Sequence, residues 1–106
     1  MINNNSNALS IIRRIINTII PDSKIILFGS RARRDNNQES DYDLLVITRD
    51  VFDLQEKRTL RSLIRKELAK SKIPADVLIQ SEDEINLKKE ITGHILKKVL
   101  QEGVAL

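Results

Sequence analysis

The sequence predicts a single small domain in which helices and short strands alternate along the chain. Aliphatic residues recur at helical spacing from Ala8 to Ile20, which gives one broad apolar face. Two largely apolar runs follow, at residues 25–28 and 42–48, and both are typical of strands. The 106 residues, 41% of them hydrophobic and 31% charged, suffice for one ordinary core and leave little room for a second.

Helix-breaking and capping residues set the expected bounds of each element. Pro21-Asp22 ends the first helix, Gly29 ends the first strand and Gly103 stops the last helix. The expected order is a helix at 8–20, a strand at 25–28, a short helix at 30–34, a strand at 42–48, a helix at 54–70 capped by Asp53, a strand at 74–80 and a last helix from about 87 to 102. Residues 1–7 are polar and are expected to fray, so that the domain spans 8–106.

The helical periodicity also predicts which side chains point inward. The expected inward residues are Leu60, Leu63, Ile64 and Leu68 in the helix at 54–70, and Ile91, Ile95, Val99 and Leu100 in the last helix. Ser81 followed by Glu82-Asp83-Glu84 resembles an N-cap with an acidic first turn.

Composition excludes several classes of protein. The absence of cysteine rules out disulfides, thiol catalysis and Cys-based zinc sites, and it fits a cytoplasmic location. No apolar run approaches the ~20 residues of a membrane span, and the N-terminus lacks the pattern of a secretion signal. The net charge of +3 is small and only three residues are aromatic, so nucleic-acid binding is not expected as the main activity.

Gly29 and Ser30 stand where the first strand enters the short helix. Unpaired backbone N–H groups at a helix start bind phosphate oxygens, and a glycine lets the backbone approach closely. Arg31 and Arg33 flank this turn and are candidates to contact a triphosphate, although residues two apart on a helix diverge, so only one is expected to face the site. The alternative is an ordinary turn with solvated arginines.

Three acids are candidates for a metal site. Asp41 and Asp43 are two apart at the start of the second strand, so their side chains are expected on one side. Two like charges beside a buried run repel each other, and magnesium, which prefers carboxylate and phosphate oxygens, relieves that repulsion. Asp76 starts the third strand and could join them as a ligand or as the base for an attacking hydroxyl. The alternative is that these acids are solvated at strand ends.

Gly29-Ser30, ten residues, and then Asp41-x-Asp43 resembles the DNA polymerase beta-like nucleotidyltransferase superfamily. Gly-Ser-Arg-Ala-Arg followed by Ser-Asp-Tyr-Asp-Leu-Leu-Val is similar to its minimal nucleotidyltransferases, the MNT group, and the similarity extends from about Ala8 to Val104, including Asp76 at the family's third carboxylate position. Arg34 departs from the family, which usually has glycine there to suit the turn out of the short helix.

This resemblance implies an α+β fold with a mixed sheet packed with helices, and metal-dependent nucleotidyl transfer. Gly29 and Ser30 would hold the triphosphate of ATP, with Arg31 and Arg33 beside it, while Asp41, Asp43 and Asp76 would bind magnesium or manganese and form the catalytic set. Family members often pair with HEPN-type ribonuclease toxins, and some act as antitoxins by placing AMP on a toxin tyrosine. The implied partner is therefore such a toxin, in a hetero-oligomer.

Two other functions remain open from the sequence. The chain could neutralise a toxin by binding alone, although a pure binding surface has no need of three such acids. It could also transfer a nucleotide to a small molecule such as an antibiotic, which generally involves a larger chain. No segment is left over for an acceptor-binding domain, so a partner protein is expected to complete the acceptor site.

Overall fold

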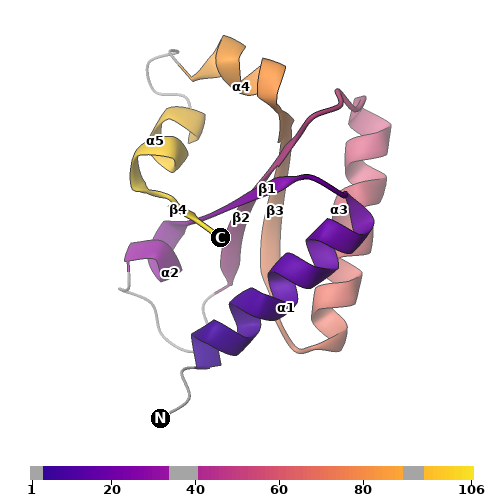
Figure 1. The fold of residues 1–106 in the computed structure, drawn as a ribbon, viewed down its shortest axis with the longest axis vertical. Helices are drawn as coiled ribbons and strands as arrows, with labels where there is room; N and C mark the ends of the chain where they lie inside the picture. Colours follow the sequence, from indigo (N-terminus) through magenta and orange to yellow (C-terminus); the bar gives the residue numbers. More distant parts are fainter. Residues whose placement is uncertain (1–3, 34–40, 90–94) are drawn as a thin grey trace.

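The structure, a computed structural model, describes residues 4–33, 41–89 and 95–106. These residues form a four-stranded sheet with helices on both faces (Figure 1). The elements are α1 (Asn4–Ile19), β1 (Lys24–Phe28), α2 (Gly29–Arg33), β2 (Tyr42–Thr48), α3 (Leu54–Lys70), β3 (Ala75–Ser81), α4 (Glu82–Lys88), α5 (Ile95–Glu102) and β4 (Val104–Ala105).

The sheet is mixed, with the strand order β3-β2-β1-β4. Strand β2 runs parallel to β3 and antiparallel to β1, and β4 is antiparallel to β1. The parallel β2–β3 pair is joined through α3, which packs on the sheet as a crossover helix. The expectation of an α+β fold with a mixed sheet is confirmed.

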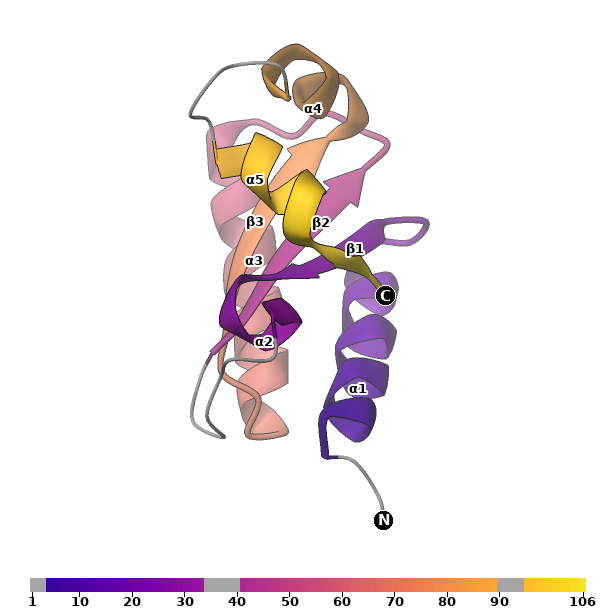
Figure 2. The ribbon, with the colours of Figure 1, turned by 90° about the vertical axis from the view of Figure 1, so that its left-hand side faces the viewer.

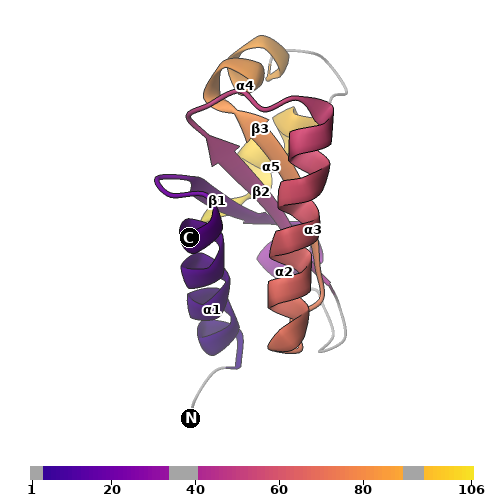
Figure 3. The same ribbon diagram turned by 90° about the vertical axis from the view of Figure 1, so that its right-hand side faces the viewer.

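Helices α1 and α3 lie side by side over one face of the sheet (Figure 3), and α5 lies over the other (Figure 2). Alternation along each strand creates this division, because successive side chains point to opposite faces. On β2, Leu44 and Val46 join the larger core under α1 and α3, whereas Leu45 packs with Leu96 and Val99 of α5.

The predicted strands and the α3 bounds agree closely with the structure, and Asp53 caps α3 with its side chain accepting from the Glu56 backbone N–H at 2.7 Å. Helix α1 begins at Asn4, so the chain is helical before Ala8. Strand β4 has no counterpart in the sequence prediction, because two exposed residues carry no periodic pattern. Residues 1–3 and Arg34, with the expected turn out of the short helix, lie outside the described part of the chain.

The prediction of one helix over 87–102 is wrong. A capping box at Ser81 and Glu84 starts α4 directly after β3, and a separate helix, α5, begins at Ile95. Consequently Ile95 and Leu100, expected inward, are 53% and 37% exposed, and Leu96 takes the inward position with Val99. The expected inward Leu63 of α3 is likewise exposed, while Ile64 and Leu68 are buried. Ile91, also expected inward, is not among the described residues.

An ion pair joins α3 to α4 at the end of the sheet where β2 and β3 finish. The Lys57 ammonium lies 2.6 Å from a carboxylate oxygen of Glu84, with the Lys57 side chain 10% exposed and that of Glu84 21%. The other Glu84 oxygen accepts the Ser81 backbone N–H at 2.8 Å. Partial burial opposes ionisation of Glu84, but these hydrogen bonds outweigh it and hold the pKa of Glu84 below its ordinary value.

In the described ranges, no helix has both the length and the apolar character needed to cross a membrane.

We predict that Glu84→Gln lowers the free energy of unfolding at pH 7 by about 1–3 kcal/mol, because the substitution leaves the buried Lys57 charge without a counter-charge. The lowered pKa of Glu84 means that its contribution is complete above the ordinary value of about 4.3 and is lost as the pH falls through the lowered pKa. Urea denaturation should therefore show the two proteins converging as the pH falls toward and below this lowered pKa.

Lys70→Gln serves as the control, since it removes only the exposed pair with Glu67 and should change stability by less than about 0.5 kcal/mol. Equal stability of wild type and Glu84→Gln at pH 7 would contradict the role of the buried pair.

Candidate active site

The topology brings the strand ends that carry Gly29, Asp43 and Asp76 to one end of the sheet. Strands β2 and β3 are parallel and both begin there, while the antiparallel β1 finishes there, at the lower end of the sheet in Figure 1. In register, Asp43 pairs with Asp76 on one side and with Phe28, the residue before Gly29, on the other. This end is opposite to the Lys57–Glu84 pair.

Asp43 and Asp76 are direct neighbours across the parallel pair, so their side chains emerge on the same face, about 4.8 Å apart at the backbone. That face also carries Leu45 and Leu78, which pack in the smaller core with α5. The two acids lie beyond this core, with Asp43 half-buried and Asp76 exposed. The structure therefore brings Asp43 and Asp76 together, as the sequence indicated.

Asp41 lies just before β2 and is exposed. Within the described residues, no three His, Cys, Asp or Glu side chains are close enough to form a ready-made metal centre. The donor set nevertheless fits magnesium, because two adjacent carboxylates and a third acid two residues away supply only oxygen ligands. Magnesium commonly takes one or two carboxylates and completes its shell with substrate phosphates and water.

Gly29 lies against the Asp43 carboxylate with a φ of +73°, in the left-handed region that favours glycine. A Cβ added at Gly29 would stand 2.1 Å from Oδ2 of Asp43. The glycine is thus needed both for the turn from β1 into α2 and for the close approach of Asp43. This contact joins the phosphate-turn candidate to the acid pair.

Ser30 is half-buried in the first turn of α2, a five-residue helix that contacts β1, β2 and α5. The Arg31 guanidinium lies over the ring of the buried Tyr42, 3.9 Å from the ring centroid. Tyr42 packs in the larger core. Its contact with Arg31 was missed because the two residues are eleven apart in sequence and come together only through the sheet. The side chain of Arg33 lies outside the described residues.

Comparison with known proteins agrees with this geometry. A family model described as a nucleotidyltransferase domain matches residues 9–106. Two curated proteins of Methanocaldococcus jannaschii, both named "Putative protein adenylyltransferase", are similar in sequence. One is 34% identical over 94 residues, covering 87% of this chain and 88% of the relative. The other is 37% identical over 83 residues, covering 78% and 76% respectively.

Two solved structures share the fold. A chain of a toxin–antitoxin crystal structure with AMP-PNP superposes with a TM-score of 0.63 at 20% identity, covering 95% of this chain and 71% of that chain. A chain from the structure of a tri-AMPylated Shewanella oneidensis HEPN toxin in complex with an MNT antitoxin has a TM-score of 0.58 at 19% identity, covering 95% and 69% respectively.

We predict that Gly29→Ala destabilises the fold by about 1–2 kcal/mol from the positive φ alone, with a further cost from displacement of the Asp43 carboxylate. Thermal denaturation of Gly29→Ala, Asp43→Ala and the double variant measures the coupling. The double variant should lose less stability than the sum of the losses in the two single variants, because alanine at position 43 has no carboxylate to displace. If the losses of the two single variants simply add, the clash between a side chain at position 29 and the Asp43 carboxylate contributes nothing to the destabilisation.

A second stability prediction concerns Asp76, which faces the like charge of Asp43 across the strand pair. Like charges opposite each other destabilise a sheet by about 0.2–1 kcal/mol, so Asp76→Asn should raise the melting temperature in a metal chelator. About 1 kcal/mol corresponds to about 4–8 °C in a domain of this size.

Asp83→Asn gives the matched comparison, because this exposed acid in the first turn of α4 favours the helix dipole and its loss should lower the melting temperature. The same sign of change for both variants would mean that Asp43 and Asp76 do not repel each other.

Proposed function

The chain belongs to the nucleotidyltransferase domain family and is an enzyme of that class, and on this premise we propose that it transfers AMP from ATP to a hydroxyl group of a protein. The observation that carries the proposal is the register pair Asp43–Asp76 with Gly29 packed against Asp43. This arrangement joins a phosphate-binding turn to adjacent carboxylates. The names of the two relatives from Methanocaldococcus jannaschii support the choice of a protein acceptor.

In the proposed reaction, the acceptor oxygen attacks the α-phosphorus of ATP and a new P–O bond forms. The bond between the α-phosphorus and the bridging oxygen breaks, and pyrophosphate leaves. The hydroxyl proton passes to a base, and Asp76 is the candidate because it is exposed beside Asp43. The backbone N–H groups at Gly29 and Ser30, with the Ser30 hydroxyl, orient the triphosphate.

Asp41, Asp43 and Asp76 are the residues that would hold magnesium or manganese. A divalent metal held by these acids would supply positive charge to offset that of the phosphates and so favour in-line displacement. Arg31 lies over Tyr42, which sets the guanidinium at the start of β2. From there it adds positive charge beside the turn, and Arg33 is a second candidate for the same role.

We further propose that the acceptor is a tyrosine of a HEPN-type toxin bound to this chain as a hetero-oligomer. Support comes from the shared fold with chains of toxin–antitoxin structures, one of which holds AMP-PNP and another a tri-AMPylated toxin. The product of the neighbouring gene is the first partner to test, in particular one with an Arg-x4-6-His motif.

The pairing of Asp43 with Asp76 disfavours a module that acts by binding alone, because adjacent acids on one face cost stability without a ligand. Transfer to an antibiotic is the remaining enzymatic alternative. An assay that offers the product of the neighbouring gene and aminoglycosides as acceptors distinguishes protein modification from transfer to an antibiotic.

We predict that Asp43→Asn lowers kcat/KM for AMP transfer by at least about a hundredfold, because a charge that holds a metal supplies several kcal/mol to the transition state. Ser30→Ala should lower it by only about tenfold, since one hydrogen bond is lost and the backbone donors remain. The measurement is mass spectrometry of the acceptor after incubation with ATP and magnesium.

Lys97→Gln on α5, an exposed residue outside the site, is the control and should leave transfer unchanged. Substantial turnover by Asp43→Asn at saturating magnesium would refute the site. An unmodified partner that nevertheless binds wild type tightly would favour the non-catalytic alternative.

A further inference from the structure

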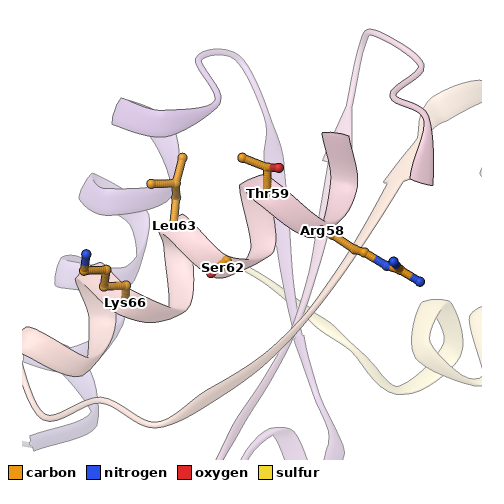
Figure 4. Close-up of a pocket in the computed structure, with 5 residues that line it drawn as sticks. All are labelled: Arg58, Thr59, Ser62, Leu63 and Lys66. Atoms are coloured by element: carbon orange, nitrogen blue, oxygen red, sulfur yellow. The ribbon is translucent and has the colours of Figure 1, made fainter. Parts of the chain in front are cut away.

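A groove of about 650 Å³ runs along the outer side of α3 to the start of β2 and β3. Its described lining includes the cations Arg58, Arg61, Arg65 and Lys66 and, at the strand end, Asp41 and Pro74. A smaller hollow on the same helix adds Thr59 and Leu63, and Figure 4 shows these two side chains projecting on the same side of α3.

Positive charge predominates in this groove, which carries four cations and one acid, Asp41, among its described lining residues. Arg58, Arg61, Arg65 and Lys66 form no ion pair with any residue in the described ranges. The nearby acids of α3 are engaged elsewhere, since Glu56 belongs to the helix cap and Glu67 pairs with Lys70. Four cations along one groove, without an ion-pair partner among the residues that the structure describes, favour an anionic ligand.

The groove extends from the start of α3 toward the strand end that carries the candidate active site. Arg58 lies near the start of α3, and Ala69 lies at its end, next to Pro74 and Ala75. The Tyr42 backbone N–H donates to the Pro74 carbonyl at 2.9 Å, which holds Asp41 at this same end. The cations therefore lead away from Asp41 along the helix, over about 16 Å between Arg58 and Ala69.

We infer that this groove, the α3 groove, binds an acidic segment of the protein acceptor and presents its hydroxyl group to the active site. The inference rests on the proposed transfer to a protein hydroxyl. An extended peptide advances about 3.3 Å per residue, so acidic residues about two to five positions from the hydroxyl would meet the groove cations. Asp41 at the inner end repels a carboxylate there and leaves that end to the uncharged hydroxyl residue.

The lining favours a peptide over a nucleic acid. None of the lining residues that the structure describes is aromatic, so this part of the groove offers no ring on which a base could stack. Ile73, Pro74 and Ala75 instead supply an apolar wall for side chains next to the hydroxyl, and Asp41 opposes a phosphate at the inner end.

The test uses fluorescein-labelled peptides with one tyrosine and three glutamates two to five positions away, made in both chain directions. Matched peptides carry glutamine in place of glutamate, and a labelled single-stranded RNA is the third probe. Binding is measured by fluorescence anisotropy to the full chain without ATP or metal, so it does not depend on catalysis. The groove variant is Arg58→Glu with Arg65→Glu, and the control is Lys97→Glu with Lys98→Glu, which makes the same change in net charge on the opposite face of the sheet.

An acidic peptide should bind wild type at least about tenfold more tightly than its glutamine counterpart, and about tenfold more tightly than it binds the groove variant. The control variant should stay within about twofold. All four changed residues are exposed, and the melting temperatures of the variants confirm that they fold.

Equal binding by the groove variant, equal binding of the glutamine peptide, tighter groove-dependent binding of RNA, or no peptide binding up to about 1 mM would each overturn the inference. An adenylylation assay on the same peptides is read separately. Acidic-peptide binding that depends on the groove, without AMP transfer to any acceptor, would leave the groove standing and refute the proposed function. AMP transfer that proceeds equally well in wild type and in the groove variant would leave the proposed function standing and overturn the groove inference.

Discussion

The parallel pairing of β2 with β3 is the contact on which both the fold and the site depend. Leu44, Leu45 and Val46 of β2 are fully buried between helices on the two faces of the sheet, so the register of this strand is held by burial on both sides. A shift by one residue would turn every side chain to the opposite face. The same register that buries these three residues sets Asp43 beside Asp76 and against Gly29.

The two ends of the sheet carry opposite electrostatic arrangements. Where β2 and β3 finish, Lys57 and Glu84 neutralise each other and a capping box starts α4. Where the strands begin, Asp43 and Asp76 are like charges and Arg31 lies on Tyr42. Interactions at the first end stabilise the chain by themselves, whereas the two like charges at the second end repel each other.

The sequence patterns correctly predicted the structural features that depend on residues close together in the chain. The strands, α3 with its Asp53 cap and the Gly29 turn follow from spacing, apolar runs and residue chemistry within a few positions. The prediction failed where distant partners decide the outcome. A continuous helical pattern near the C-terminus hid the break between α4 and α5, and the phase of α5 against Leu45 decides that Leu96 rather than Ile95 points inward. The Arg31–Tyr42 contact and the α3 groove likewise arise from tertiary packing.

The stacking of Arg31 on Tyr42 has a spectroscopic consequence. Tyr42 is the single tyrosine of the chain, which contains no tryptophan, so all of its intrinsic tyrosine emission comes from this one ring. The ring is 5% exposed and lies where α2 meets the first residue of β2, one position from both Asp41 and Asp43. A nucleotide that draws the Arg31 guanidinium away from the ring would alter that emission directly. The wild-type protein thus carries an optical reporter at its candidate active site, without any added label.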